Sequence, residues 1–595
     1  MELSPADLSW AETGPTSRLF GDIYFSADDG RAETGHVFLR PNRISERLAR
    51  TEQLTIGETG FGTGLNLLSV LALWQNLPAP RPKLHYITTE LHPLSVADLN
   101  KAHAAWPDLA ELSEAVRQVY PPAVGGGHRR WLFDGAVCVD FLWGDAEQAL
   151  AAYAPLGGVQ VDGWFLDGFS PALNPDMWTQ GVFEAIARLS GPGTSLSTFT
   201  VAGSVRKGLA AAGFEVQKAP GFGRKRDMLV ATYINATPLT APKPRRKMAV
   251  IGAGIAGVST AWQMSLQGYD VTLLEAGPTV CSGASGSPAS AFTPYFQPDW
   301  SPRARMLTSG FFTARHVLAM LRTKGHDITG RQDGMLMLDM PEKSRRCERF
   351  AAWQHSLDLP DTVRRRLCAD EMSEQAGVDL DCPGWLYPQA GWVNLHALAT
   401  AMLVDSEGRI ETMFDTRVMA LEHDGQDWRL HHCCERGVVG IMSADMVVVA
   451  CAGAASELLP DLSLATVHGQ ILSFLAPPQL AGLEKPLNCG HSLLPHGDGR
   501  LSWGASFRHK IDTAEILSEE TDKLLGDFER CFGHALDAET AAVQVWAGLR
   551  CTQPSRLPMI GPVTGRPDGL YVHLAHGARG SLTAALMMPA ALYGA

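Results

Sequence analysis

Two clusters of glycine residues are the parts of this 595-residue chain whose spacing is best suited to chemistry. One occupies positions 58–64 and the other positions 252–257, about 190 residues further along. Glycine lets the backbone turn tightly and approach a ligand closely, where a side chain would block the contact. Because the two clusters have different spacings, we expect them to bind two different nucleotide-containing ligands.

The first cluster has the spacing G-x-G-x-G, formed by Gly60, Gly62 and Gly64, and Glu58 stands just before it. A dinucleotide loop has the spacing G-x-G-x-x-G and no carboxylate in front, because that charge would repel the phosphates. S-adenosylmethionine carries no phosphate, and Glu58 is placed to meet its cationic methionine end. The cluster therefore predicts a methyl-donor site, although an ordinary structural turn would use the same glycines.

Two further carboxylates follow the next apolar runs of the chain. Glu90 ends the run that starts at Tyr86, and Asp145 follows the run that ends at Trp143. At the carboxyl end of a parallel strand a carboxylate can accept hydrogen bonds from both ribose hydroxyls, which is the role expected for Glu90. Asp145 is placed to reach the adenine amino group. Each alone is more often a surface residue, but with Glu58 they mark three successive strand ends on the ligand side of one sheet.

Asp167 lies at the end of a fourth apolar run, in the segment Trp164–Trp178. An alkylammonium group has a pKa near ~10, so an amine must lose a proton before it can be methylated. A carboxylate at this position would hold the ammonium, accept its proton and orient the nitrogen for attack. Phe169 and Trp178 are candidates for stacking on a planar base. The alternative is an ordinary turn surrounded by core aromatics.

The second cluster, formed by Gly252, Gly254 and Gly257, has the dinucleotide spacing G-x-G-x-x-G. It lies between an apolar strand and a helix predicted at Val258–Gln267, and Glu275 ends the next strand. The glycines would admit a pyrophosphate to the N-terminus of the helix, and Glu275 would bind the adenosine ribose. Because every part of the fingerprint is present in the right order, this cluster predicts a dinucleotide site.

Later segments favour FAD over NAD as the dinucleotide, because they resemble parts of the amino-acid oxidases. These segments are a second FAD loop with Ala284 and Ser285, a return strand at Met446–Ala450, the stretch Ala547–Arg550, and a glycine turn over the flavin ring with Gly577 and Gly580. The resemblance implies that Arg550 and Arg579 bind the carboxylate of the substrate. A guanidinium fork suits a carboxylate and would leave the neighbouring C–H bond facing the flavin. Either arginine alone would also fit a surface ion pair.

The elements that must position these residues form two α/β domains. Strand-like and helical runs alternate over residues 1–240, which predicts a doubly wound, mostly parallel, Rossmann-like sheet. Two strands near Phe214 and Met228 predict a terminal antiparallel hairpin, and this arrangement resembles a class I methyltransferase. Prolines and cations at 241–247 predict a basic linker. For residues 248–595 we expect an FAD-binding Rossmann domain with an inserted α+β substrate domain.

The net charge of −13 argues against broad, nonspecific binding of nucleic acid but permits a local basic patch. Arg224, Lys225 and Arg226 form one candidate patch at the hairpin tip, whereas the cations at 243–247 are more simply a solvated linker. No apolar run is long enough to span a bilayer and no secretory signal is present, so we expect a cytoplasmic protein without membrane contact. The 11 cysteines are scattered without a C-x-x-C pair, which predicts reduced thiols and no metal site.

Three segments together resemble one family, the bifunctional tRNA 5-methylaminomethyl-2-thiouridine biosynthesis proteins. They are Glu58–Asn66, Trp164–Trp178 and Gly221–Arg226. The resemblance covers nearly the whole chain in the same domain order, and the middle segment is long and unusual. A member of this family is expected to continue past the flavin turn with a longer closing helix and tail than the run to Ala595 provides.

The resemblance implies two consecutive steps on the wobble uridine of certain bacterial tRNAs. The FAD domain would oxidatively remove the carboxymethyl group from 5-carboxymethylaminomethyluridine, and the S-adenosylmethionine domain would methylate the exposed amine. The patch Arg224–Arg226 would then contact tRNA phosphates, although a solvated hairpin tip would have the same composition. Two alternatives stay open: a fused oxidase and methyltransferase for free small amines, which the negative charge favours, and a non-catalytic tRNA-binding scaffold, which the intact glycines and carboxylates disfavour. The sequence gives no indication of the oligomeric state.

Overall fold

The structure, a computed structural model, describes residues 3–11, 14–25, 29–223, 225–235, 247–297, 299–339, 361–434, 437–536, 541–588 and 590–593. The chain divides into two compact units. Unit 1 comprises Met1–Arg245, Leu266–Gly268 and Met587–Ala595, and unit 2 comprises Arg246–Ser265 and Tyr269–Leu586. The predicted basic linker at 241–247 lies outside the described residues except for Lys247, which is the first residue of a strand.

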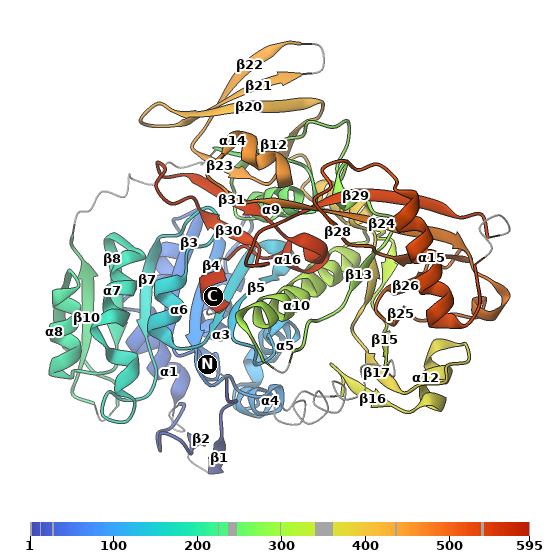
Figure 1. The fold of residues 1–595 in the computed structure, drawn as a ribbon. Coiled ribbons are helices and arrows are strands. Elements are labelled where there is room, and N and C mark those ends of the chain that lie inside the picture. The colour runs from blue at the N-terminus through green and yellow to red at the C-terminus, as the bar shows by residue number, and fades with distance from the viewer. Residues whose placement is uncertain are drawn as a thin grey trace. The chain divides into compact units, whose positions relative to one another are not determined.

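An eight-stranded sheet forms the centre of unit 1 (Figure 1). From edge to edge its strands are β5 (Gly126–Leu132), β6 (Val137–Trp143), β4 (Lys83–Glu90), β3 (Gln53–Thr59), β7 (Val161–Leu166), β8 (Ser190–Thr198), β10 (Asp227–Tyr233) and β9 (Phe214–Pro220). Strands β6, β4, β3, β7 and β8 are parallel, whereas β5 and β10 run antiparallel to their neighbours. The doubly wound sheet and its terminal hairpin confirm the predicted fold, and the edge strand β5 is an addition to it.

Helices connect these strands, and a small hairpin of β1 (Leu8–Ala11) and β2 (Gly14–Ser17) precedes them. The α-helices of unit 1 are α1 (Gly30–Thr34), α2 (Ile44–Leu48), α3 (Leu65–Gln75), α4 (Val96–His103), α5 (Ala110–Val119), α6 (Ala146–Ala152), α7 (Gln180–Arg188) and α8 (Gly203–Ala211). Helix α3 is apolar almost all round, and Leu67, Leu68 and Val70 are fully buried. Such a helix belongs inside a core, so the glycine loop that precedes it has a rigid support.

Unit 2 contains a six-stranded sheet that holds the second glycine cluster. Its strands, in order, are β19 (Ile410–Met413), β12 (Asp270–Leu274), β11 (Lys247–Ile251), β23 (Met446–Val449), β31 (Leu570–Leu574) and β30 (Met559–Pro562). All neighbours are parallel except β30, which is antiparallel to β31. This is the FAD-type Rossmann sheet that the sequence predicts, with β23 as the return strand.

The predicted substrate part of unit 2 is built on a nine-stranded mixed sheet. Its strands are β16 (Arg365–Leu367), β17 (Gly384–Tyr387), β15 (Met335–Leu338), β25 (Leu487–Asn488), β26 (Ser492–Pro495), β27 (Arg500–Gly504), β24 (Ala465–Leu475) and β28 (Arg508–His509), with β29 (Gln544–Thr552) paired to β24. Two small sheets complete the unit: β13 (Ser290–Phe292), β18 (Gly391–Val393) and β14 (Gly330–Arg331), and β20 (Thr416–His423), β21 (Trp428–Cys434) and β22 (Val439–Ala444). Figure 1 shows the β20–β22 sheet in orange beside β12 and β23.

The α-helices described in unit 2 link its sheets. They are α9 (Ile255–Leu266), α10 (Pro302–Thr323), α12 (Ala369–Ala376), α13 (Leu395–Asp405), α14 (Ala455–Leu458), α15 (Ser518–Phe532) and α16 (Gly580–Thr583). None of the helices in the described part of the chain combines the length and the apolar character needed to cross a bilayer.

The last described residues of the chain pack within unit 1, whereas the limits drawn from the sequence place them in the second domain. Tyr593 is 1% exposed, and its hydroxyl donates a hydrogen bond to the carbonyl of Gly127 on β5 (2.9 Å). A Cβ atom on Gly126 would lie 2.2 Å from the Tyr593 ring, and one on Gly127 would lie 2.3 Å from the sulfur of Met588. Gly126 and Gly127 therefore form a glycine seat for the end of the chain.

Candidate active sites

The first glycine loop connects β3 to α3 with a backbone that only glycine adopts without strain. Gly60, Gly62 and Gly64 have φ angles of 72°, 52° and 72°, all in the left-handed region. A Cβ atom on Gly60 would lie 3.2 Å from the carbonyl oxygen of Asp167, and one on Gly62 would lie 3.3 Å from the ring of Tyr24. The loop thus passes close to the end of β7, at the edge of the sheet where ligands bind in such folds.

Glu90 and Asp145 lie at the ends of the neighbouring strands β4 and β6. The Glu90 carboxylate accepts hydrogen bonds from the backbone N–H groups of Gly62 (2.9 Å) and His92 (2.8 Å), and burial raises its pKa. Asp145 accepts a hydrogen bond from the N–H of Gln148 (3.0 Å) and caps helix α6. Glu90 therefore contacts the glycine loop directly. Asp145 lies at the same edge of the sheet, but its described hydrogen bond is the one that caps helix α6. Their ribose and adenine roles stay predictions.

Glu58 is placed differently from what the sequence suggests. It is fully buried, and its two oxygens accept hydrogen bonds from the Thr88 hydroxyl (2.7 Å) and the Asn66 amide (2.9 Å). Burial raises the pKa of this carboxyl group to about 8. Because the side chain is directed into the packing between β3, β4 and α3, its position favours support of the loop over direct contact with the methionine end of a ligand.

Asp167 follows β7, at the strand end where the sequence places it, and its approach to the methyl group stays a prediction. Its carboxylate accepts hydrogen bonds from the backbone N–H of Gly168 (2.8 Å) and from the same Asn66 amide (2.9 Å). Burial raises the pKa of Asp167 to about 6, with a further increase from Glu33 and a decrease from Lys225. Asn66 thus joins Asp167 to Glu58. Sequence reasoning missed Asn66, although its place in the first turn after the third glycine was a usable signal.

An aromatic group lies next to Asp167. The ring of Phe169 is 4.9 Å from that of Phe20 and 5.1 Å from that of Tyr24. Trp178, predicted to stack on a base, is only 7% exposed, and its indole N–H donates to the carbonyl of Phe169 (3.0 Å). Burial therefore makes Trp178 a support for this loop, while Phe169 remains partly exposed. Phe20 and Tyr24 come from the N-terminal segment, which carried no motif.

The tip of the β9–β10 hairpin brings one predicted basic residue close to Asp167. Lys225 pairs with Glu33 (3.1 Å) and lies 4.4 Å from the centre of the Phe199 ring. Arg226 is exposed, and Arg224 lies outside the described residues. A positive charge therefore stands beside the candidate methylation site, where the phosphate backbone of a nucleic acid would need one.

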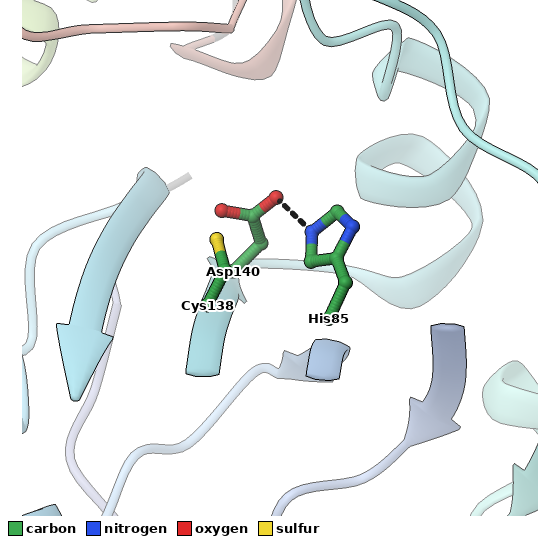
Figure 2. Close-up of side chains that lie close together, drawn as sticks. All are labelled: His85, Cys138 and Asp140. Atoms are coloured by element: carbon green, nitrogen blue, oxygen red, sulfur yellow. Dashed lines mark hydrogen bonds and ion pairs between the residues drawn. The ribbon is translucent and has the colours of Figure 1, made fainter. Parts of the chain in front are cut away.

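One buried cluster in unit 1 has residue types that can bind metals. Ligand atoms of His85, Cys138 and Asp140 lie within 4.8 Å of one another, and Figure 2 shows the sulfur and the imidazole on either side of the carboxylate. However, Arg129 donates two hydrogen bonds to Asp140 (2.7 and 2.6 Å), His85 makes a third contact and Tyr153 donates another. Burial alone raises the pKa of Asp140, but the Arg129 charge lowers it below its usual range. The arrangement is that of a buried ion pair, because Arg129 occupies the place of a cation.

The second glycine cluster borders a cavity of about 690 Å³ in unit 2. Gly252 has φ 102°, and a Cβ atom there would lie 2.8 Å from the carbonyl oxygen of Ala450. A Cβ atom on Gly257 would lie 1.8 Å from the carbonyl oxygen of Gly252, so helix α9 can approach β11 only without a side chain. These are the two close approaches that a dinucleotide loop requires, and they fit the predicted FAD.

The other predicted FAD residues line the same cavity. Glu275 accepts hydrogen bonds from the N–H groups of Ala253 (2.6 Å) and Gly277 (2.8 Å) at the end of β12. Ser285 accepts one from the N–H of Ile255 (3.2 Å), the first residue of α9. The cavity lining also includes the predicted residues Gly254, Ala284, Gly577 and Gly580. The structure thus brings together segments that are about 300 residues apart in the sequence, and their contacts with FAD remain a prediction.

Arg550 and Arg579 both line this cavity. Burial lowers the pKa of Arg550 to about 10; its guanidinium donates to the carbonyl of Ser506 (3.1 Å) and lies 4.7 Å from the centre of the Phe507 ring. Arg579 lies 5.4 Å from the centre of the Tyr295 ring, and its pKa is lowered by burial and by the nearby charge of Arg303. Among the residues that the structure describes, neither arginine forms an ion pair with a carboxylate, so both are suited to an anionic substrate.

Comparisons with known proteins agree with the two sites. Residues 247–587 match the family model of FAD-dependent oxidoreductases, and residues 107–234 match that of S-adenosyl-L-methionine-dependent methyltransferases. The protein is therefore a methyltransferase joined to an FAD-dependent oxidoreductase. It is 36% identical to the tRNA 5-methylaminomethyl-2-thiouridine biosynthesis bifunctional proteins MnmC of Chromobacterium violaceum and of Pseudomonas aeruginosa strain UCBPP-PA14, over 98% of this chain and 93% of each relative. The chain belongs to this family of bifunctional proteins.

The fold of unit 2 also occurs in solved structures. Glycine oxidase from Geobacillus kaustophilus superposes with a TM-score of 0.50 at 24% sequence identity, covering 58% of this chain and 92% of that one. L-α-glycerophosphate oxidase from Mycoplasma pneumoniae gives the same TM-score at 15% identity, covering 59% of this chain and 95% of that one. At these identities the likeness establishes a shared fold.

Proposed function

We propose that the protein carries out two consecutive steps on the wobble uridine of tRNA. Unit 2 removes the carboxymethyl group of 5-carboxymethylaminomethyl-(2-thio)uridine, and unit 1 methylates the amine that this exposes to give 5-methylaminomethyl-(2-thio)uridine. The names of its relatives support the substrate, and the two cofactor sites support the pair of reactions. The place of action is the cytoplasm, where tRNA is found.

The observation that carries the oxidation step is the pair of cavity arginines without a carboxylate partner among the described residues. Arg550 and Arg579 hold the carboxylate of the N-carboxymethyl group and keep its methylene carbon at a fixed position. FAD, when bound, supplies the two-electron oxidation that converts the N–CH₂ bond to C=N. Water then adds to this carbon, and the C–N bond breaks to release glyoxylate and the aminomethyl nucleoside.

In the methylation step Asp167 acts on the exposed amine. With a pKa of about 6 its carboxyl group is ionised at neutral pH, so it attracts the substrate ammonium and accepts its proton. The free lone pair then attacks the methyl group of S-adenosylmethionine, and S-adenosylhomocysteine leaves. Asn66 holds the Asp167 carboxylate in place, and Phe169 offers a ring for the uracil base. Lys225 and Arg226, with Arg224, contact tRNA phosphates.

A second function is a fused oxidase and methyltransferase for free small amines. The observation in its favour is that two guanidinium groups can hold the carboxylate of any N-alkylglycine, whatever the other nitrogen substituent is. The net charge of −13 also gives a nucleic acid no general attraction.

One experiment separates the two functions. The purified protein, loaded with FAD, is incubated with labelled S-adenosylmethionine and tRNA that carries 5-carboxymethylaminomethyluridine, and the digested nucleosides are separated by mass. We expect label in 5-methylaminomethyluridine, and unlabelled 5-aminomethyluridine when S-adenosylmethionine is omitted. Label that enters only small molecules, with tRNA unchanged, would favour the second function and exclude the first.

A further inference from the structure

A tryptophan and an arginine lie side by side on one face of the nine-stranded sheet. Trp546 and Arg550 belong to β29, which pairs with β24, and both line the cavity of unit 2. Because side chains alternate between the two faces of a strand, residues four positions apart project from the same face. Gly548 lies between them on that face, and the strand pairing places it opposite Gly469 on β24. The sheet beneath Trp546 and Arg550 therefore carries two adjacent glycines.

These two glycines leave the room that the large side chains occupy. A Cβ atom on Gly548 would lie 2.4 Å from the ring of Trp546, and one on Gly469 would lie 2.1 Å from a guanidinium nitrogen of Arg550. The indole is thus laid over Gly548 and the guanidinium over Gly469. Cβ positions of directly opposed residues in an antiparallel pair are about 5 Å apart. The flat ring and the charged fork are therefore neighbours above the same part of the sheet.

The indole of Trp546 is suited to contact a ligand. Its residue is half-buried, and its N–H group donates no hydrogen bond to any residue that the structure describes. Buried tryptophans usually pair this N–H group, so an unpaired indole on a cavity wall indicates a surface for a bound molecule. The neighbouring Arg550 is held in direction by the carbonyl of Ser506 (3.1 Å) and by the ring of Phe507.

The dimensions of a carboxymethylaminomethyl pyrimidine match this arrangement. Four covalent bonds link its carboxylate carbon to the pyrimidine ring, so the extended link spans about 5 Å. A carboxylate held by Arg550 therefore brings the pyrimidine to the neighbouring indole. Stacked rings prefer centre-to-centre separations of about 4.5–7 Å, and every nucleobase has a face for such a contact. N-methylglycine, in contrast, has only a methyl group at the same end of the molecule.

The flavin ring is the other flat group expected in this cavity, but its predicted contacts come from a different sheet. The glycine loop after β11 and the glycine turn after β31 both follow strands of the six-stranded sheet. Trp546 projects from the nine-stranded sheet, on the same face as the carboxylate-binding Arg550. This shared face favours the substrate over the flavin as the partner of the indole.

We propose that Trp546 stacks on the pyrimidine of the substrate while Arg550 holds its carboxymethyl group. The proposal rests on the proposed function, in which the substrate is a modified uridine in tRNA. Stacking fixes the plane of the base, and the spacing between the indole and the fork matches the length of the aminomethyl link. The cavity thereby favours an N-carboxymethyl group that is attached to a flat ring over a free N-alkylglycine.

The test follows flavin reduction by absorbance in the FAD-loaded full chain. The substrates are tRNA containing 5-carboxymethylaminomethyluridine, the free nucleoside and N-methylglycine. Two variants disrupt the stacking surface in different ways: Trp546→Ala deletes the ring, and Gly548→Ala places a methyl group where the ring now lies. Gln544→Ala is the matched control, because Gln544 is on the same face of β29 but is exposed and does not line the cavity. Flavin content and thermal unfolding are recorded for each variant.

For Trp546→Ala we expect KM to rise about 5- to 100-fold with the nucleoside and with tRNA while kcat changes little, because a stacking contact made equally in ground and transition states is lost. Gly548→Ala should raise the same KM values, and Trp546→Phe, which keeps a smaller flat ring, should give an intermediate rise. Oxidation of N-methylglycine should change less than about threefold in all three variants. Gln544→Ala should behave as the wild type with every substrate.

An unchanged KM for the nucleoside in Trp546→Ala, or an equal loss with N-methylglycine, would overturn the proposal. If Trp546→Ala loses its flavin, Trp546→Leu keeps much of the apolar volume without a flat face, and it should still raise KM for the nucleoside but not for N-methylglycine. A wild-type protein that oxidises N-methylglycine but neither nucleotide substrate would instead show that the proposed function is wrong.

Discussion

Asp167 and Arg550 are ionisable side chains in buried surroundings, and burial disfavours the charged form of each. Burial raises the pKa of the Asp167 carboxyl to about 6 and lowers that of the Arg550 guanidinium to about 10, so both remain charged at neutral pH. The proposed substrate carries the matching groups, a carboxylate for Arg550 and, after oxidation, an ammonium for Asp167. Each binding event therefore compensates a desolvation cost that the free protein already bears.

Replacing Asp167 by Asn should lower kcat/KM for methylation by about 10²- to 10⁴-fold, the usual contribution of a general base. In the wild type, methylation should slow as the pH falls through about 6, because protonation of the raised-pKa carboxyl removes the base and its attraction for the ammonium. Transfer of label from S-adenosylmethionine to aminomethyl-tRNA, measured on both sides of this pH, tests both points. Oxidation by the same variant should continue; a parallel loss of both activities would contradict separate sites.

At the scale of elements, each glycine loop is the junction between a central strand and a buried helix. The loop from β11 to α9 illustrates the constraint, since a Cβ atom on Gly257 would lie 1.8 Å from the Gly252 carbonyl oxygen. A methyl group here must push the helix away from the strand, and such overpacking costs about 1–3 kcal/mol. The helix N-terminus and the loop would then no longer meet the pyrophosphate together.

Gly257→Ala should consequently weaken FAD binding by about 10- to 100-fold. The measurement is the flavin-to-protein absorbance ratio during titration of the apoprotein with FAD. Gly526→Ala is the matched control, because Gly526 lies in helix α15 and a Cβ atom there meets nothing within 4 Å. It should bind FAD as the wild type does, and equal weakening in the two variants would refute the packing argument.

The sequence predicts these loops well because their signals are local. Glycine spacing, the preceding apolar strand and the acidic strand ends all lie within short windows, so both Rossmann sheets and the β9–β10 hairpin are found from the sequence. Strand β5 was not predicted, because His128, Arg129 and Arg130 give it the composition of a surface loop. These side chains are nevertheless buried, and Arg129 is neutralised by Asp140 from the adjacent strand. The pairing of Arg129 with Asp140 cannot be predicted until β5 and β6 are known to be neighbours in the sheet.

The same distinction applies to the candidate sites. The strand-end positions of Glu90 and Asp167 follow from the sheet topology, but the burial of Glu58 and Trp178 depends on packing from distant segments. Phe20 and Tyr24 approach Phe169 from a segment about 150 residues earlier in the chain, where no motif marks them. Sequence patterns thus locate the backbone of a site more reliably than the side chains that complete it.

At the scale of the whole molecule, unit 1 is not a continuous stretch of chain. Its edge strand β5 receives Tyr593 and Met588 in the glycine seat of Gly126 and Gly127, and Met588 belongs to the hydrophobic core around α6 and α7. The Leu156 N–H also donates to the carbonyl of Met587 (3.0 Å). The stability of the methyltransferase unit should therefore depend on residues that follow the oxidoreductase unit in sequence.

Tyr593→Ala should lower the melting temperature of unit 1 by about 5–10 °C, because it removes a buried ring and a hydrogen bond. Differential scanning calorimetry with FAD present, together with flavin retention during heating, distinguishes the two units. Tyr593→Phe keeps the ring and should recover most of the loss. Gly127→Ala should reproduce the defect from the opposite side of the contact, and unaffected melting in both Tyr593→Ala and Gly127→Ala would show that the seat contributes no stability.

The glycine seat has a consequence for the order in which the protein matures. A ribosome completes the eight-stranded sheet of unit 1 long before it reaches Met588 and Tyr593, and domains generally fold as they emerge. While unit 2 is being synthesised, Gly126 and Gly127 therefore lack the contacts that Tyr593 and Met588 later make with them. Unit 1 therefore acquires the contacts of Met588 and Tyr593 only after the oxidoreductase unit has been synthesised.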